Sequence, residues 1–380
     1  MKAIVVGGGI GGLTTALTLQ AKGIEVEVYE AANEFREAGA GIWIAPNAMK
    51  VYDQLGLADE LKAAGYPYKG GASIGTYDGT ILGKMNADVI KERHGHYTTA
   101  IHRGKYQQIL LRHTHHAQPG KRFVRYEEKD GQVTAFFEDG TSATGDILVG
   151  ADGIKSAVRT QMLGEVSYRY TGQTCWRLLT DFPLQFEASD MMEIWGNVGG
   201  LRVGAGKISE DTVYTFITAH RPQGEKDNQE TIKDELLELC KAYPEQVIKL
   251  LQATDSANII RNDLYDYKPI HQWSKGRVVL VGDAAHATTP NMGQGACQAV
   301  ESAYVLAHML SEKETYEEAF ASYQAMRIKK AHKVTKMSWQ LGKMVSINNG
   351  VGRWLRNMVM KMTPDSSSQK MQDQLYNLPL

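Results

Sequence analysis

Three glycines near the start of the chain stand at a spacing that serves phosphate binding. Gly7, Gly9 and Gly12 form the pattern GxGxxG directly after a short apolar run, residues 3–6. In this pattern the first glycine permits a tight turn, the second lets the backbone approach a pyrophosphate, and the third lets a helix pack on the strand. The unpaired amides and the dipole at the helix N-terminus then stabilise the phosphate charge. The spacing therefore predicts a dinucleotide site.

An acidic residue completes this first constellation. Residues 24–29 alternate apolar and acidic side chains, which predicts a second strand, and Glu30 follows directly. A carboxylate at this place accepts hydrogen bonds from an unphosphorylated adenosine ribose, which favours FAD or NAD over NADP. The alternative is a glycine turn that only joins a strand to a helix. The full order of strand, glycine turn, helix, strand and acid argues against that alternative.

Two later motifs repeat the arrangement of a buried strand followed by an acidic turn. Asp152 and Gly153 follow the apolar run 147–151, and Gly282 and Asp283 follow the run 277–281. Either aspartate could merely cap a helix. Two such turns together with the glycine loop are hard to explain by capping alone, and they favour FAD over NAD.

With these three motifs, the sequence resembles the FAD-dependent aromatic hydroxylases, the family with the p-hydroxybenzoate hydroxylase fold. The resemblance covers about residues 1–330 and rests on the GxGxxG, DG and GD motifs in this order. It implies that the first motif holds the ADP part of FAD, that Asp283 binds the ribityl chain, and that residues 290–295 lie against the isoalloxazine. The helix that starts near Gln294 is expected to direct its positive end at the flavin and to stabilise the reduced anion.

The resemblance also implies further contacts with a non-covalently bound FAD. Arg103 matches a family arginine that contacts FAD, and Gln107 stands one turn later on the same helical face. Cys297 replaces an Asn that is common in relatives, and Trp43 is bulky for a segment beside the flavin. The predicted cofactor-binding residues are Gly7, Gly9, Gly12, Glu30, Ala31, Trp43, Arg103, Gln107, Phe123, Asp152, Asp283, Pro290, Gly293, Gln294, Gly295, Ala296 and Cys297.

The chemistry that the resemblance implies is that of a monooxygenase. NADH or NADPH would reduce the flavin, O2 would add at its C4a atom, and the hydroperoxide would transfer oxygen to a small aromatic or heteroaromatic substrate. Arg202 and Tyr214 lie on neighbouring strand-like segments and are the candidate catalytic residues, a pairing similar to that of FAD-dependent urate hydroxylases. Arg202 would hold an anionic or carbonyl-bearing substrate. The alternative is that Arg202 makes a surface contact and Tyr214 packs in a sheet.

Other functions remain open at this point. Tetracycline-inactivating monooxygenases differ mainly in pocket shape, while geranylgeranyl reductases and halogenases share the FAD fold. The sequence lacks the Trp-x-Trp-x-Ile element that is typical of halogenases. From a different functional class, a flavin-binding redox sensor without turnover would carry the same motifs. Further candidates for the pocket, although sheet aromatics more often belong to the core, are Trp176, Arg177, Trp195 and His220.

The elements that must position these residues predict an α/β fold. We expect a Rossmann-type FAD-binding domain with an inserted, mainly antiparallel β-sheet substrate domain, a cleft between the two, and C-terminal helices. The predicted ranges are 1–72, 97–166 and 259–330 for the FAD-binding domain, 73–96 and 167–258 for the substrate domain, and 331–380 for the C-terminal helical segment. A hairpin over residues 123–138 is predicted to turn at Asp130 and Gly131. Within the C-terminal helical segment, the tail after Pro364 is polar.

Composition limits the partners and the location. Lys and Arg total 42 against 43 Asp and Glu, so the net charge of -1 provides no basic field for nucleic acid. Three distant cysteines and the histidines at 113–116 fit neither a disulfide framework nor a metal site, which favours the cytoplasm. No apolar run is long enough to cross a membrane. The basic amphipathic stretch 352–362 is expected to pack its apolar stripe on the domain junction, with a membrane surface as the alternative. A monomer or a homodimer is expected.

Overall fold

A parallel sheet forms the centre of the nucleotide-binding half. The computed structural model describes residues 1–37, 39–183 and 189–380. In this part of the chain the sheet has the order β18-β19-β12-β1-β2-β8. Its strands are β1 (Lys2–Val6), β2 (Glu25–Tyr29), β8 (Ala117–Gln118), β12 (Ile147–Gly150), β18 (Ser274–Lys275) and β19 (Val278–Leu280). Strands β12 and β19 are buried along their whole length, as expected for parallel strands that are covered on both faces.

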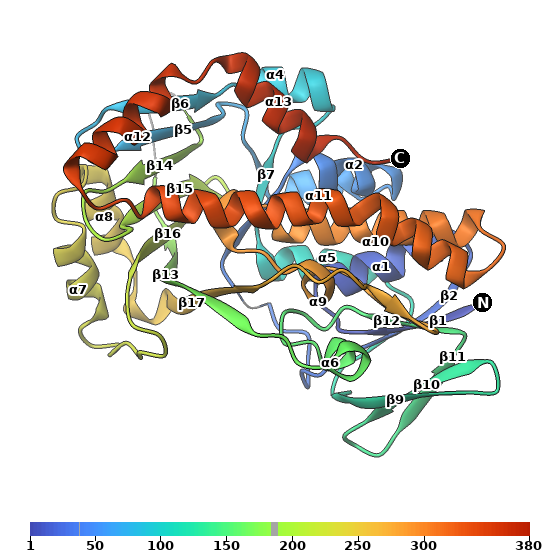
Figure 1. Cartoon of the computed structure of the whole chain (residues 1–380). Coiled ribbons are helices and arrows are strands. Elements are labelled where there is room, and N and C mark those ends of the chain that lie inside the picture. The colour runs from blue at the N-terminus through green and yellow to red at the C-terminus, as the bar shows by residue number, and fades with distance from the viewer. Residues whose placement is uncertain (38, 184–188) are drawn as a thin grey trace.

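Helices from distant parts of the chain cover this sheet. Helix α1 packs against α5 and α10, and α10 packs against the long α11. In Figure 1, α11 runs across the molecule from the parallel sheet toward the second large sheet. A buried ion pair between Arg327 and Glu301 joins α11 to α10. The helices are α1 (Ile10–Gln20), α2 (Pro46–Gln54), α3 (Ala58–Ala64), α5 (Arg103–His113), α6 (Ala157–Leu163), α9 (Asp283–His286), α10 (Gly295–Glu312) and α11 (Tyr316–Val345).

A small antiparallel sheet extends from the nucleotide-binding half. It consists of β9 (Phe123–Lys129), β10 (Gln132–Phe137) and β11 (Ser142–Gly145). Asp130 and Gly131 join the first two strands with φ angles of 50° and 78°. Two successive positive φ angles are the geometry of a two-residue hairpin turn. The predicted hairpin is therefore confirmed.

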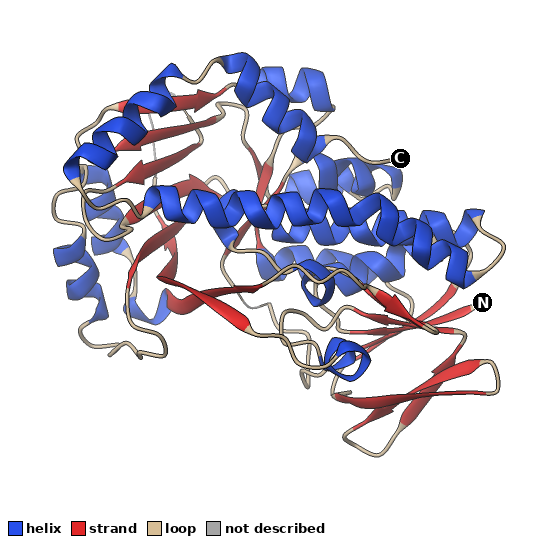
Figure 2. Ribbon diagram, viewed as in Figure 1, coloured by secondary structure: helices blue, strands red, loops and turns tan. Residues whose placement is uncertain are grey.

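A seven-stranded, mainly antiparallel sheet forms the second half, in the order β17-β13-β16-β15-β14-β5-β6. Its strands are β5 (Ala72–Thr76), β6 (Ile81–Met85), β13 (Tyr168–Asp181), β14 (Met191–Trp195), β15 (Arg202–Lys207), β16 (Thr212–His220) and β17 (Ile259–Tyr267). Helices α7 (Ile232–Leu239) and α8 (Glu245–Ala253) cover one face, and Figure 2 shows them as a layer beside the sheet. A short three-stranded sheet has the order β3 (Gly41–Ile44), β7 (Thr99–His102) and β4 (Tyr66–Pro67). In the sequence, its strands fall between segments of the two halves. The predicted fold class is confirmed.

The strand pairing moves two of the predicted domain boundaries. Strand β17 pairs with β13 of the seven-stranded sheet, so we place the return to the nucleotide-binding half after Tyr267 and not at residue 259. Helix α11 continues without a break through residues 330 and 331, so no boundary of the C-terminal segment falls there. Residues 38 and 184–188, which fall in the predicted ranges, lie outside the described residues.

The C-terminal segment folds as two further helices, α12 (Gly350–Met362) and α13 (Asp365–Tyr376). Helix α13 forms in the polar tail, inside the range that is predicted as a C-terminal helical segment. The expected packing of the apolar stripe of α12 is wrong for much of the stripe, because Val351, Trp354 and Val359 are exposed. It is Arg356 that is buried, with its guanidinium 4.8 Å from the Trp195 ring centre. In the described residues, no helix is long and apolar enough to cross a bilayer.

Candidate functional site

The three sequence motifs begin at one edge of the parallel sheet. Strands β1, β12 and β19 are neighbours, and the Ala151 amide donates to Val6 O at 2.8 Å. The Val281 amide donates in turn to Gly150 O at 2.9 Å. Each motif therefore follows the carboxyl end of a strand, where ligands of open α/β sheets bind. Stretches that are far apart in the sequence meet here.

The three glycines of the first loop have separate reasons to lack a side chain. A Cβ at Gly7, which has a φ of +110°, would lie 2.4 Å from Ala151 O, and one at Gly12 would lie 1.8 Å from Gly7 O. A Cβ at Gly9 would meet nothing within 4 Å among the described residues. Gly9 is also the N-cap of α1, which has no side-chain cap and no acidic residue in its first turn within the described structure. The open space beside these free amides fits a phosphate group.

Glu30 and Gln107 hold the middle of the glycine loop. Glu30 Oε2 accepts from the Gly8 amide at 2.6 Å, and its Oε1 accepts from the Ala32 amide at 2.8 Å. Gln107 Nε2 donates to Gly8 O at 2.7 Å. Ala31 continues the chain directly after Glu30 and is half-buried. The structure thus brings the predicted acid and the predicted glutamine together at the predicted loop.

Asp152 has one carboxylate oxygen that is buried and unused. Its Oδ2 accepts from the Val158 amide at 3.1 Å, at the start of α6. Its Oδ1 is buried and has no hydrogen-bond partner in the described part of the chain. Burial raises the pKa of this carboxyl above its usual value. Asp152 therefore caps a helix and in addition presents an acceptor, which a hydroxyl of a bound nucleotide would satisfy.

Asp283 and Arg103 are near enough for their charges to interact. Asp283 is at the start of α9 and is exposed to solvent; the protein atoms around it raise the pKa of its carboxyl by desolvation, while the charge of Arg103 acts in the opposite direction. Arg103 is exposed at the first residue of α5. A residue that the sequence reasoning passed over, Arg159, donates to Ile154 O at 2.8 Å and to Ala284 O at 3.3 Å. Arg159 thereby ties the Asp152 turn to the Asp283 turn.

The loop before α10 is fitted closely to the strand that carries Trp43. Gly293 has a φ of +61°, and a Cβ there would lie 3.1 Å from the Trp43 ring. Gln294 is the N-cap of α10 and makes no side-chain cap in the described structure, which leaves the first amides of α10, from Gly295 and Ala296 onward, without a side-chain acceptor. Pro290 begins the short 3-10 turn that precedes them.

Two further predicted cofactor residues, Cys297 and Phe123, are buried against structural partners. Cys297 Sγ accepts from the Ala45 amide at 3.4 Å and donates to Trp43 O at 3.6 Å. Burial raises the pKa of this thiol to about 12, so it stays protonated and joins α10 to the strand beside it. Phe123 begins β9, and its side chain belongs to the apolar core of the nucleotide-binding half.

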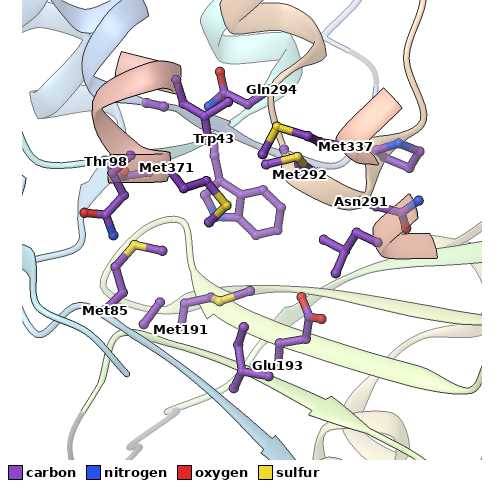
Figure 3. A pocket seen from close by; sticks show the side chains of 18 of the residues that line it. Trp43, Met85, Thr98, Met191, Glu193, Asn291, Met292, Gln294, Met337 and Met371 are labelled. Carbon is purple, nitrogen blue, oxygen red and sulfur yellow. The ribbon is translucent and has the colours of Figure 1, made fainter. Parts of the chain in front are cut away.

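A cavity of about 600 Å³ lies between the seven-stranded sheet and the nucleotide-binding half. Every second residue of several strands lines this cavity, because side chains along a strand point to opposite faces of the sheet in turn. The opposite wall consists of Trp43, the loop before α10, and helices α11 to α13, and Figure 3 shows the Trp43 ring in the middle of these walls. The polar and aromatic residues on the sheet face of the cavity include Arg177, Glu193, Trp195, Arg202, Tyr214, Phe216 and Thr218.

Arg202 lies in the cavity with unused donors. Its side chain is buried, with Nη1 3.5 Å from Glu193 Oε1 and the guanidinium 5.0 Å from the Phe216 ring centre. The Nε and Nη1 groups have no hydrogen-bond partner among the residues described. The alternative that Arg202 makes a surface contact is therefore wrong. A buried guanidinium with free N–H groups requires an acceptor, which a ligand oxygen would provide.

Tyr214 lies on the same sheet face as Arg202. Arg202 is opposite Thr218 and Tyr214 is opposite Gly206, which places Phe216 between the two side chains. Burial raises the pKa of the Tyr214 phenol, so the hydroxyl keeps its proton. Its ring is 5.9 Å from the Trp43 ring, and a Cβ at Gly41 would lie 2.3 Å from it. Tyr214 thus packs against strand β3, which carries Gly41 and Trp43, and also lines the cavity.

The remaining sequence candidates divide between the two faces of the sheet. Arg177 and Trp195 line the cavity, as does Glu193, which the sequence reasoning missed although the alternation from Met191 to Trp195 places it on the same face as Trp195. Trp176 belongs to the core on the α7 and α8 side, where its Nε1 donates to Asp227 Oδ2 at 2.7 Å. His220 is not among the cavity residues. The described chain holds no His, Cys, Asp and Glu cluster suited to a metal.

Comparisons with known proteins agree with this geometry. The family model described as FAD binding domain matches residues 1–338. The chain is 36% identical over 364 residues to the aurachin C monooxygenase/isomerase of Stigmatella aurantiaca. This alignment covers 95% of this chain and 94% of the relative. It is 30% identical over 386 residues to the 2-heptyl-3-hydroxy-4(1H)-quinolone synthase of Pseudomonas aeruginosa, in an alignment that covers 99% of this chain and 98% of that relative. The crystal structure of Klebsiella pneumoniae HpxO with FAD and uric acid matches with a TM-score of 0.91 at 29% identity, covering 99% of this chain and 96% of that one.

Proposed function

The chain belongs to the family of FAD-binding aromatic hydroxylases, and from this membership we propose that it hydroxylates a small aromatic or heteroaromatic ring with O2 and NADH or NADPH. The observation that carries the proposal is the buried Arg202, which lines a cavity bounded by the loop before α10 and whose Nε and Nη1 groups have no hydrogen-bond partner among the described residues. A ligand-binding sensor could use the same donors, so the enzyme is favoured by the relatives, which include a monooxygenase/isomerase and a 3-hydroxybenzoate 6-hydroxylase.

The residues of the three motifs fit FAD at the edge of the parallel sheet. The free amides of α1 beside Gly9 would hold the pyrophosphate, and Glu30 would accept from the adenosine ribose. Asp283 would bind the ribityl chain with Arg103 nearby. The N-terminus of α10 would stabilise negative charge on the flavin ring. Bound FAD, once reduced by the nicotinamide cofactor, supplies the activation of O2.

The cavity residues would orient the ring and keep water out. Arg202 would donate to an anionic or carbonyl oxygen of the substrate, and Glu193 beside it would fix the guanidinium. Tyr214, as a neutral phenol, would donate a hydrogen bond to a ring substituent that gains negative charge. The rings of Trp43 and Phe216 supply the apolar wall that excludes water from the reacting atoms.

Replacing Arg202 with Ala tests the substrate site. We expect FAD content to stay at one per chain while the substrate-stimulated kcat/KM for NAD(P)H oxidation falls about 30-fold or more, which corresponds to about 2 kcal/mol for a lost charged hydrogen bond. The substrate for this assay would first be identified with the wild-type protein from a panel of aromatic acids, phenols, purines and tetracyclines. Each compound would be scored by NAD(P)H consumption and by the gain of one oxygen atom in the product mass.

Arg221→Ala is the matched control, since Arg221 stands at the end of the same sheet and is not among the cavity residues. It is expected to keep wild-type turnover. Coupled turnover at the wild-type rate in Arg202→Ala would refute the assignment of the pocket. If no compound in the panel stimulates NAD(P)H oxidation in the wild-type holoprotein, the flavin-binding sensor would become the better description.

A further inference from the structure

The cavity contains a compartment that lies away from Arg202. We name as the distal compartment the wall residues Met85, Ala87, Ile90, Met371 and Leu375, which come from the end of β6, from α4 (Ala87–His94) and from α13. In Figure 3, Met85 and Met371 lie on one side of the Trp43 ring, and Asn291, Met292 and Met337 lie on the other side. The distal compartment is therefore one end of the cavity.

Strand pairing fixes the separation of this compartment from Arg202. Met85 on β6 is opposite Ala72, which is opposite Met191, and Met191 is opposite Gly206. Arg202 is four residues from Gly206 along β15, and β15 is three strands from β6. At about 4.8 Å between strands and about 3.4 Å per residue, the two places are about 14 Å apart across the sheet and about 14 Å apart along it. A ring held by Arg202 does not extend that far.

The lining of the cavity is charged at one place and is uncharged and largely apolar elsewhere, although Thr98, Ser367, Ser368 and Gln372 add polar groups to it. Its charged residues, within the part of the chain that the structure describes, are Arg177, Glu193 and Arg202, all on the sheet face near one another. The methionines that line it come from β6, β14, the loop before α10, α11, α12 and α13. These are Met85, Met191, Met292, Met337, Met344, Met360 and Met371. Methionine side chains adapt to irregular apolar ligands because they are unbranched and flexible.

A small polar ring alone would leave this apolar end filled with water. Ala87, Ile90 and Leu375 are buried, and the water beside such side chains is released when an apolar group takes its place. We propose that the ring of the substrate carries an unbranched apolar chain of several carbons, which occupies the distal compartment while the ring lies near Arg202 and Tyr214. This proposal rests on the proposed function and names the class of substrate that the same site takes.

A chain-length series measures the occupation of the compartment directly. The holoprotein would be titrated with 2-alkyl-4(1H)-quinolones and with 4-alkylphenols, from methyl to nonyl, and the Kd determined by calorimetry. We expect the Kd to fall about four-fold for each added methylene, the equivalent of about 0.8 kcal/mol per buried CH2, until the compartment is full. A Kd that does not fall with chain length in either series, or the absence of binding in both, would overturn the proposal.

Paired methionine substitutions locate the chain. In Met85→Gln/Met371→Gln the compartment keeps its size but becomes polar, so we expect the Kd of the heptyl compounds to rise about ten-fold and that of the methyl compounds to change less than two-fold. Met326→Gln is the control, because Met326 is 40% exposed, as Met371 is, and does not line the cavity. Equal effects of the double variant on the heptyl and methyl compounds would overturn the location of the chain.

The two proposals fail in different ways. Protein that binds no FAD, or that holds FAD and consumes no NAD(P)H with any ring compound, would contradict the proposed function. Holoprotein that turns over short-chain compounds as well as long-chain ones, with equal Kd values, would keep the function and remove the apolar chain. The Kd values of the chain-length series and the FAD content are therefore measured on the same protein preparation.

Discussion

At the scale of single residues, burial decides which polar side chains act and which only support. Arg202 is buried and Asp152 is half-buried, and each has buried polar atoms without a partner among the described residues, which is costly unless a ligand satisfies them. His286, in contrast, is buried with a partner, since its Nε2 lies 2.9 Å from Ser302 Oγ. It belongs to the GD motif and yet has the environment of a structural residue. Position in a motif alone therefore does not assign chemistry.

His286 gives a prediction for the stability of the protein in acid. Burial lowers its pKa to about 3, whereas an unfolded histidine keeps a pKa of about 6.5. Between these values the unfolded chain binds a proton that the folded chain does not, so the free energy of unfolding falls as the pH falls below about 6.5. From pH 7 to pH 5 we expect this group to remove about 2 kcal/mol of stability.

Urea unfolding at both pH values measures this effect against two variants. His286→Gln, which cannot take up the proton, is expected to lose about 2 kcal/mol less than the wild type over the same pH interval. His115→Gln, at an exposed position, is expected to show the wild-type dependence. The same pH dependence in wild type and His286→Gln would show that the residue is not held neutral by the fold.

The residues of the nucleotide half could be read from the sequence because their neighbours are local. Glu30 and the glycine loop belong to one strand-helix-strand unit, and the structure brings them into contact at Gly8. Arg159 was not singled out, since its partner Ala284 is brought near only by the pairing of β12 with β19. Glu193 was missed although it shares a face of β14 with the candidate Trp195, because alternation along a strand does not say whether that face is turned to the cavity or to the core.

At the scale of elements, the glycine loop and α1 act as one unit with two separable requirements. A Cβ at Gly12 would collide with the Gly7 carbonyl, while a Cβ at Gly9 would enter free space in the described structure. The φ of Gly9 is -75°, which alanine also adopts. The fold therefore requires Gly12, and only the ligand requires Gly9.

Two alanine substitutions separate these requirements. Gly9→Ala is expected to leave the unfolding free energy of the FAD-free protein unchanged and to weaken FAD binding about ten-fold or more, because the methyl group occupies the phosphate position. Gly12→Ala is expected to destabilise the FAD-free protein by about 1–3 kcal/mol, the usual cost of overpacking. Flavin fluorescence titration and urea unfolding give the two quantities. Undiminished FAD affinity in Gly9→Ala would place the phosphate elsewhere.

Elements differ in how far the sequence determines them. The hairpin at Asp130 and Gly131 was predictable because the turn itself requires positive φ angles. The bounds of helix α13 were not predictable, because its polar sequence gives little signal and because distant residues contact it, as in the ion pair of Asp373 with Arg93. The exposed stripe of α12 shows the reverse case, in which a strong amphipathic pattern does not reveal which face the fold covers.

At the scale of the whole molecule, the cofactor connects stretches that the chain keeps far apart. The order β19-β12-β1-β2 places the turns after four strands at one edge, while the second sheet closes the cavity from the other side. The interleaved domains were predictable from the repeated strand-and-acid motifs. The boundary after Tyr267 was not, because β17 pairs with β13 from a distant part of the sequence.

Hydrogen exchange should therefore respond to FAD at three stretches together. The first turns of α1 and α10 have amides with no side-chain acceptor in the described structure, and the Asp152 turn carries an unused acceptor, so each is expected to gain protection when FAD binds. We expect slower exchange in residues 8–13, 152–158 and 283–298 at the same FAD concentration. Helices α7 and α8, which cover the sheet face away from the cavity, serve as the internal control and should not change. Because a single ligand contacts all three stretches, their protection should rise with one common Kd. Protection confined to one stretch, or rising with different Kd values, would mean that the motifs do not share one flavin.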